Sequence, residues 1–133
     1  MGDIMKEWIL YVGASAVLVV VALLMASHGP YYETGIASWY GPGFDGNLTA
    51  NGEVYDMHGI SAAHKTLPFG TVVEVVELDT GNRLVVRIND RGPFVEGRII
   101  DLSRGAAEEL GIINKGITEV GLRIISWPDD AAR

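Results

Sequence analysis

The sequence predicts a mainly β domain that follows an apolar N-terminal helix. Glycine is abundant, at 17 of 133 residues, which favours tight turns over long helices. Segments rich in β-branched residues alternate with turn signals in the second half of the chain. A faint internal repeat relates residues 67–75 to 113–120, and each copy enters a strand through glycine. Two copies of one unit favour a closed barrel with pseudo-twofold symmetry, since closure removes exposed sheet edges.

Residues 8–27 form an apolar segment without a charged side chain. A helix of that length spans about 30 Å, the hydrocarbon thickness of a bilayer. The segment is too long for the apolar part of a secretory signal, and Leu24 stands where a cleavage motif has a small residue. We therefore expect residues 1–27 to be a membrane anchor or uncleaved signal; the protein is secreted if this segment is cleaved.

Basic residues on either side of this segment predict its orientation. Lys6 precedes it, and the next basic residue after it is Lys65. Cytoplasmic flanks carry the excess of basic residues. We expect a single-pass protein of the cell membrane, with residues 28–133 on the outer, extracytoplasmic side. Residues 28–34 are then a short linker.

The predicted barrel covers residues 35–126, and residues 127–133 are expected to be a tail. One short helix is expected over 104–110, with Ser103 as its N-cap and Gly111 at its end. The clearest hairpin turns at residues 79–82. Strands are expected where β-branched residues alternate and turn residues flank them, at 35–40, 71–78, 83–88, 98–101 and 121–126.

Composition excludes several classes of function. Lys and Arg number 10 against 17 Asp and Glu, a net charge of −7, so no basic surface for nucleic acid is expected. Cysteine is absent, which excludes disulfides, thiolate catalysis and thiolate metal sites. The three histidines have no ligand spacing, so neither a metal nor another cofactor is expected.

Polar residues from separate loops are the candidates for a functional site. Asn89, Asp90 and Arg91 stand where the best predicted strand ends and a Gly-Pro turn begins, which is where small domains place reactive groups. Glu53 and His64 come from two other loops. The residues alone leave two readings open: the side chains cap turns and face solvent, or they meet in one site.

Five ordered motifs make the chain resemble a known family. They lie at residues 35–41 (GIASWYG), 49–56 (TANGEVYD), 62–71 (AAHKTLPFGT), 86–94 (VRINDRGPF) and 98–103 (RIIDLS). With them the chain resembles the rare lipoprotein A family over residues 34–126. The resemblance implies a six-stranded double-psi β-barrel with an open groove that binds glycan, related in fold to expansins and family 45 glycoside hydrolases.

The resemblance also implies an activity. Characterised members are endolytic lytic transglycosylases that cut the β-1,4 bond between N-acetylmuramic acid and N-acetylglucosamine on peptide-poor strands and leave 1,6-anhydromuramyl ends. The expected partners are peptidoglycan and, through the N-terminal helix, the membrane; the protein is expected to be a monomer. A non-catalytic, expansin-like glycan-binding barrel is the alternative, and an ordinary glycoside hydrolase is the third.

The active-site residues of the family match Asp90, Glu53 and His64 here. By this resemblance Asp90 is the principal acid and base, Glu53 a second carboxylate that raises the pKa of Asp90 by its charge, and His64 an orienting hydrogen-bond partner. One group acting twice and two carboxylates sharing the work both remain possible. The expected substrate-binding residues are Trp39, Tyr40, Asn51, Asn89 and Arg91.

Three of these assignments keep an alternative. Trp39 and Tyr40 either stack on sugar rings or pack in the barrel, and Arg91 either faces away from Asp90 or holds the lactyl carboxylate of the substrate.

Two features depart from the family. The chain has no cysteine for a lipid anchor, which agrees with a membrane helix, and it ends soon after the last predicted strand, where many members carry a glycan-binding domain. The resemblance therefore leaves septal targeting open.

Overall fold

The computed structural model describes residues 16–19 and 30–129 and divides the chain into two units, Met1–Pro30 and Tyr31–Arg133. In the first unit, residues 16–19 are helical and exposed. The rest of the predicted membrane segment at 8–27 lies outside the described residues. Within the described ranges, no helix is both long and apolar enough to cross a membrane.

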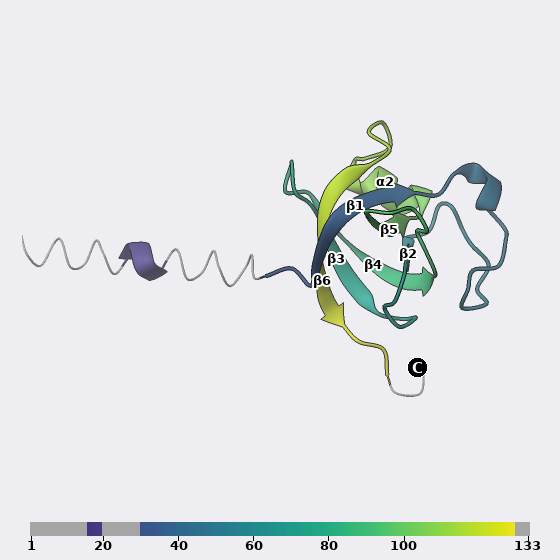
Figure 1. Cartoon of the computed structure of the whole chain (residues 1–133), viewed down its shortest axis with the longest axis horizontal. Coiled ribbons are helices and arrows are strands. Elements are labelled where there is room, and N and C mark those ends of the chain that lie inside the picture. Colours follow the sequence, from purple (N-terminus) through teal and green to yellow (C-terminus); the bar gives the residue numbers. More distant parts are fainter. Residues whose placement is uncertain (1–15, 20–29, 130–133) are drawn as a thin grey trace, which may run out of the picture. The chain divides into compact units, whose positions relative to one another are not determined.

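The second unit is a closed six-stranded barrel in the order β1-β5-β2-β4-β3-β6 (Figure 1). This confirms the mainly β barrel with one short helix. A 3₁₀ turn, η1 (Pro42–Phe44), follows the first strand. The strands and the helix are β1 (Glu33–Trp39), β2 (Ser61–His64), β3 (Val72–Glu77), β4 (Arg83–Asp90), β5 (Arg98–Leu102), α2 (Arg104–Leu110) and β6 (Thr118–Ser126).

The barrel differs from the predicted strand pattern at three places, and one of them is β6, which begins at Thr118 and not at residue 121. β1 begins inside the predicted linker, because Glu33 and Thr34 pair with Leu122 and Gly121 of β6. β2 has only four residues, too few for an alternating pattern to be visible in the sequence. It nevertheless closes the barrel by pairing with both β4 and β5.

Two parallel strand pairs give the barrel its pseudo-twofold character. β1 pairs with β5 and β2 pairs with β4, and each pairing contains a register shift, between Ile36 and Ala37 and between Ala62 and Ala63. The two copies of the sequence repeat lead into β3 and β6, which pair with each other antiparallel. The repeat therefore corresponds to equivalent strands of the two halves.

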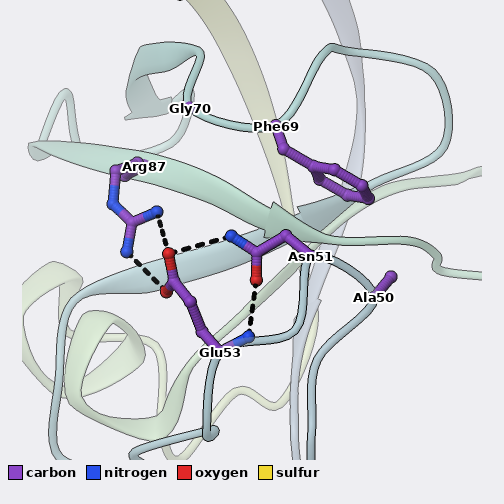
Figure 2. A pocket seen from close by; sticks show the side chains of 6 residues that line it. All are labelled: Ala50, Asn51, Glu53, Phe69, Gly70 and Arg87. Atoms are coloured by element: carbon purple, nitrogen blue, oxygen red, sulfur yellow. Dashed lines mark hydrogen bonds and ion pairs between the residues drawn. The ribbon is translucent and has the colours of Figure 1, made fainter. Parts of the chain in front are cut away.

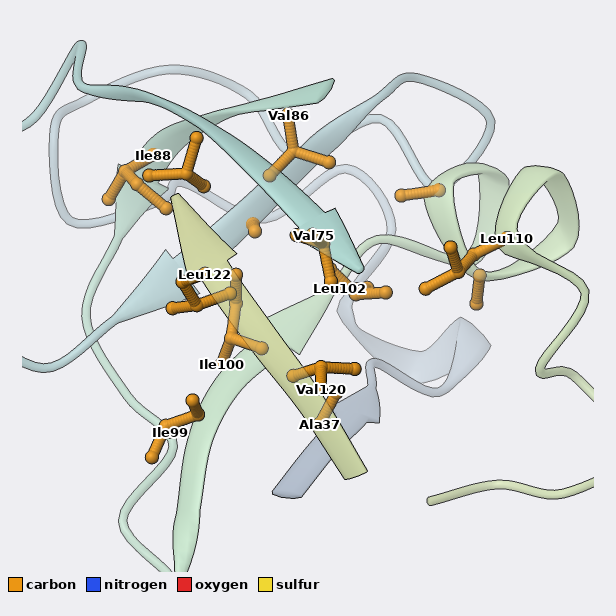
Figure 3. Packing of buried hydrophobic residues seen from close by; sticks show 14 of the residues in the cluster. Ala37, Val75, Val86, Ile88, Ile99, Ile100, Leu102, Leu110, Val120 and Leu122 are labelled. Atoms are coloured by element: carbon orange, nitrogen blue, oxygen red, sulfur yellow. The ribbon is translucent and has the colours of Figure 1, made fainter. Parts of the chain in front are cut away.

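The hydrophobic core fills the barrel and continues under α2 (Figure 3). In β4 the inward residues Val86 and Ile88 are at most 2% exposed, and Arg87 between them lies on the outer surface. This alternation is the one that the sequence predicts for the strand. The labelled core residues in Figure 3 are Ala37, Val75, Val86, Ile88, Ile99, Ile100, Leu102, Leu110, Val120 and Leu122.

Helix α2 begins and ends as the sequence predicts. The Ser103 hydroxyl accepts a hydrogen bond from the Ala106 N–H, and Gly111 ends the helix with φ of 84°. Gly105 lies so close to the preceding loop that a Cβ there would be 2.5 Å from the carbonyl oxygen of His58. This close approach fixes the loop that leads into β2.

Candidate functional site

Asp90, at the end of β4, is held by three hydrogen bonds. Its Oδ1 accepts from the N–H groups of Ala50 and Arg91, both at 2.9 Å, and its Oδ2 accepts from the Tyr40 hydroxyl at 2.8 Å. Burial first, and then the neighbouring Asp90, raise the pKa of Tyr40 well above its usual range, so Tyr40 is a neutral donor. The carboxylate is therefore fixed in orientation.

A pocket of about 360 Å³ opens beside this carboxylate. The polar residues of its lining include Tyr40, Asp90, Asp101 and Arg98. Its lining also includes Phe44 and Phe94, which are 56% and 87% exposed. The sequence analysis missed both phenylalanines, because they lie in turn-rich loops where an exposed aromatic residue is an ordinary occurrence.

Asp101 is a second carboxyl in the same pocket, and the sequence analysis assigned it no role. It lies in β5 and its Oδ1 accepts a hydrogen bond of 2.9 Å from the Ser38 hydroxyl of β1. Burial raises the pKa of Asp101, against the lowering effects of Ser38 and Arg98. The sequence signal for Asp101 was its position between Ile100 and Leu102, which are both buried. An acidic residue between two buried aliphatic residues lies on the opposite face of the strand and needs a polar environment there.

Glu53 faces a different pocket, of about 500 Å³, together with Asn51 and Arg87 (Figure 2). Arg87 donates two hydrogen bonds of 2.7 Å, one to each carboxylate oxygen of Glu53. The side-chain amides of Asn51 and Asn89 add bonds of 2.8 and 3.2 Å. Chiefly because of Arg87, the pKa of Glu53 falls to about 2. The sequence analysis assigned no role to Arg87, because only its contact with Glu53 distinguishes it from the other outward-facing residues of β4.

The loop that carries Glu53 is attached to the end of β4. The backbone N–H of Ala50 bonds to Asp90, and the N–H of Asn51 bonds to the carbonyl of Asn89. Two consecutive residues of β4 thus bond to residues of two different pockets, Asn89 to Glu53 and Asp90 to Tyr40. The Glu53 charge that we expected to act on Asp90 is paired with Arg87.

His64 is buried at 2% exposure, at the end of β2. Its Nδ1 accepts hydrogen bonds from the N–H groups of Thr66 and Leu67, at 3.1 and 3.0 Å. Nδ1 is therefore unprotonated, and Nε2 carries the proton toward Glu33 at 2.9 Å. The ring organises the turn that follows β2, and its predicted role as an orienting partner remains a prediction.

Arg91 holds the same turn from the other side. Its Nη1 donates to the carbonyl oxygens of Leu67 and His64, at 2.8 and 3.3 Å, and its guanidinium lies 3.9 Å from the centroid of the Phe69 ring. Arg91 lines the Asp90 pocket and its Nη1 also reaches the backbone carbonyl of Asp90 at 3.5 Å, but these contacts favour the reading in which its charged group faces away from the Asp90 carboxylate. His64 and Arg91 thus connect through one turn to the backbone that carries Asp90.

The two aromatic residues predicted to stack on sugars have different surroundings. Trp39 is half-buried and packs against the core, as ordinary barrel packing requires. Tyr40 lines the Asp90 pocket and stacks on Tyr55, with ring centroids 4.8 Å apart, and Phe44 meets its edge at 5.8 Å. Among the described residues no group of three or more His, Cys, Asp and Glu could hold a metal ion.

The arrangement suits proton transfer to and from a polar ligand. The Asp90 pocket combines a fixed carboxylate, a half-buried carboxyl with a raised pKa, and exposed aromatic surface. The Glu53 pocket offers a carboxylate that stays ionised and amide groups that donate and accept. A long polar ligand with apolar ring faces matches both pockets.

Comparison with known proteins identifies relatives of the barrel. A family model described as lytic transglycolase matches residues 32–122. A protein of Synechocystis sp. named probable endolytic peptidoglycan transglycosylase RlpA is 59% identical over 91 residues, covering 68% of this chain and 28% of its own length. Proteins named endolytic peptidoglycan transglycosylase RlpA from Campylobacter jejuni and Vibrio cholerae are 53% and 52% identical, covering 70% and 72% of this chain and 34% and 36% of their own lengths.

The chain spans about a third of the length of these curated relatives. Two solved structures share the barrel fold. A papain inhibitor of Streptomyces has a TM-score of 0.57 at 22% identity, over 73% of this chain and 98% of that one. An expansin of Clavibacter michiganensis has a TM-score of 0.56 at 22% identity, over 71% of this chain and 50% of that one.

Proposed function

We propose a function from one premise: the chain belongs to the lytic transglycolase family, with the rare lipoprotein A proteins among its relatives. The barrel acts as an endolytic peptidoglycan lytic transglycosylase. It breaks the β-1,4 bond between N-acetylmuramic acid and N-acetylglucosamine and leaves a 1,6-anhydromuramyl end, on strands poor in stem peptides. The names of relatives at 52–59% identity support this reaction.

The reaction needs one proton acceptor and one proton donor. The C6 hydroxyl of the muramic residue attacks its own C1, so a base must take the hydroxyl proton and an acid must protonate the departing oxygen. The surroundings of Asp90 support its role as the base, because three hydrogen-bond donors hold its carboxylate in place beside a pocket. This geometry carries the proposal.

Glu53 acts in binding within this proposal. Its carboxylate stays ionised down to a pH of about 2, so it is a poor proton donor at any pH near neutrality. An ionised carboxylate beside the amides of Asn51 and Asn89 accepts hydrogen bonds from sugar hydroxyl or acetamido groups. Because Asn89 and Asp90 are neighbours, one glycan strand can contact both pockets.

We place the barrel on the outer side of the cell membrane, with residues 8–27 as the anchor, or in secreted form if that segment is cleaved. The support for the anchor is the apolar, uncharged composition of the segment. We also propose a monomer, since a closed barrel leaves no free strand edge for pairing with a second copy.

A glycan-binding barrel without catalysis is the second candidate. The likeness to the Clavibacter expansin favours it, as does the pairing of Glu53 with Arg87, which removes one of the expected acids. An ordinary glycoside hydrolase with the same carboxyls is the third.

One product analysis separates these candidates. The full chain is incubated with peptide-stripped glycan strands, and the products are identified by mass spectrometry. Anhydromuramyl ends support the transglycosylase. Reducing ends would instead identify a hydrolase, and retained but intact glycan would identify a binding protein.

A further inference from the structure

We propose that Asp101 is the proton donor of this site and that Asp90 is its proton acceptor. The inference rests on the proposed transglycosylase function and deepens it. It replaces the assignment of both roles to Asp90, with Glu53 as the second carboxylate. Its basis is the position that the barrel gives to the two aspartates.

Both aspartates flank the same residue of β2. Ala63 pairs with Asp90 of β4 on one side and with Asp101 of β5 on the other. Residues that pair across strands project to the same face of a sheet. Asp90 and Asp101 therefore project to one side of the barrel, and the pocket that they both line agrees with this.

The register shift in β4 is what brings Asp90 to this side. Ala62 pairs with Ile88, but Ala63 pairs with Asp90, so Asn89 is passed over. Strict alternation would place Asp90 on the inward face with Ile88. A bulge redirects a side chain in this way and is frequent beside active sites. The shift between β1 and β5 is its counterpart, because it passes over Ile99 of β5 and pairs Ser38 with Asp101.

The separation of the two aspartates fits a glycosidic bond between them. Two neighbouring strand spacings put their backbones roughly 9–10 Å apart. The carboxyl pairs of enzymes that cut glycosidic bonds lie about 5–9.5 Å apart, with the sugar between them. Two aspartate side chains that line one pocket can reach a separation within that interval. Glu53, which lines the other pocket, does not share this position.

The surroundings of the two carboxyls suit opposite roles. Asp90 accepts three hydrogen bonds, which stabilise a charged carboxylate. Asp101 is half-buried and accepts one, from Ser38 on Oδ1, so its other oxygen is available for a proton. Asp90, Tyr40, Tyr55 and Arg98 interact electrostatically with Asp101. Burial and the charge of Asp90 favour its protonated form, and Ser38 and Arg98 oppose this.

The step balances with these two groups. Asp101 gives its proton to the glycosidic oxygen as the bond from that oxygen to C1 breaks. The muramic C6 oxygen forms the new bond to C1, and its proton passes to Asp90. A proton then moves from Asp90 to solvent and from solvent to Asp101, which restores both groups. No external water is consumed in the glycosidic cleavage.

Two substrates distinguish a proton donor from a residue needed for folding. The first is the natural glycan strand, whose departing oxygen requires protonation. The second is a glycan fragment with 4-methylumbelliferone on C1 of its terminal N-acetylmuramic residue, which leaves without protonation. Asp101→Asn in the full chain should slow cleavage of the natural strand by about 10²–10⁴-fold. Release of methylumbelliferone should stay within about tenfold of the unmodified protein.

Two variants serve as controls. Asp90→Asn should lose activity on both substrates, because the attacking hydroxyl still needs a base. Asp79→Asn, in the turn between β3 and β4, should leave both rates unchanged, since it lines neither pocket. Thermal melting of each variant shows whether it is folded.

A third variant tests the proposal without removing the carboxyl. Ser38→Ala deletes the hydrogen bond that stabilises the ionised form of Asp101. The high-pH side of the pH–rate profile on the natural strand should then move to higher pH, because Asp101 keeps its proton longer. Unchanged cleavage of the natural strand by Asp101→Asn, equal losses on both substrates, or an unshifted Ser38→Ala profile would overturn the proposal. If the unmodified chain makes no anhydromuramyl ends, the transglycosylase function itself fails.

Discussion

Arg87 of β4 donates one hydrogen bond of 2.7 Å to each carboxylate oxygen of Glu53. The pair is part of the wall of the larger pocket, and both side chains keep contact with solvent, at 44% and 40% exposure. This geometry lowers the pKa of Glu53 and keeps its carboxylate ionised near neutral pH, with Arg87 balancing its charge.

The Glu53–Arg87 pair should make stability depend on pH in an acidic window. Folding lowers the pKa of Glu53 from 4.5 to about 2. The stabilisation by the ion pair is therefore present above pH 4.5 and is lost as the pH falls toward 2. Glu53→Gln should have a lower melting temperature at pH 7, and its curve should converge with that of the unmodified protein near pH 2. Glu109→Gln, an exposed residue of α2, is the matched control. Parallel curves for Glu53→Gln and the unmodified protein would argue against the pairing.

Tyr40→Phe should impair catalysis while the barrel stays intact. The change removes the hydroxyl that donates to Asp90 at 2.8 Å and keeps the ring that stacks on Tyr55. A hydrogen bond to a charged group is worth about 1.5–3 kcal/mol, so kcat should fall roughly tenfold to a hundredfold. Initial rates of anhydromuramyl formation measure this, with Tyr32→Phe as an exposed tyrosine control. A normal kcat would show that Tyr40 has no part in holding Asp90.

His64→Ala should act through stability first. The buried imidazole ring accepts hydrogen bonds from the N–H groups of Thr66 and Leu67. Each of these donors, if left without an acceptor, costs about 1–3 kcal/mol of stability. Urea unfolding should therefore show a large loss. Glu33→Gln, which preserves an acceptor for Nε2, should be much milder. A stable but inactive His64→Ala would instead identify the imidazole as part of the chemistry.

Gly105→Ala should destabilise the barrel without touching the site. The new Cβ would lie 2.5 Å from the His58 carbonyl oxygen and 2.7 Å from that of Gly59, and backbone atoms cannot move aside easily. The expected loss is about 1–3 kcal/mol, as for other overpacked positions. Gly43→Ala is the control, because nothing lies within 4 Å of its added Cβ. Equal melting temperatures for the two variants would show that the loop before β2 yields readily.

The sequence was sufficient for the elements whose signal is local. The β3–β4 hairpin, the inward face of β4 and the capped helix α2 follow from alternation, a turn and one serine, and the structure contains all three. The beginning of β1 and the short strand β2 depend on partners far along the chain, which local patterns do not encode.

The site was harder to predict for the same reason. Asp90 was found because its motif is distinctive, but the partner of Glu53 and the position of Asp101 depend on contacts between separate strands. The alternation rule fails at Asp90 itself, because the register shift beside Ala63 reverses the side that it faces. A rule based on period two cannot anticipate such an insertion.

The register shift in β4 also implies that this strand is more sensitive to a change in its number of residues than to exchange of the exposed side chains before Arg87. Exposed positions such as Arg83 and Val85 tolerate exchange. Deleting one residue there would instead shift the following residues by one position. The side chains of Arg87, Asn89 and Asp90 would then all point to the opposite face of the sheet. Sequence change in β4 is thus expected to proceed by replacement, with insertions and deletions confined to the hairpin turn at residues 79–82.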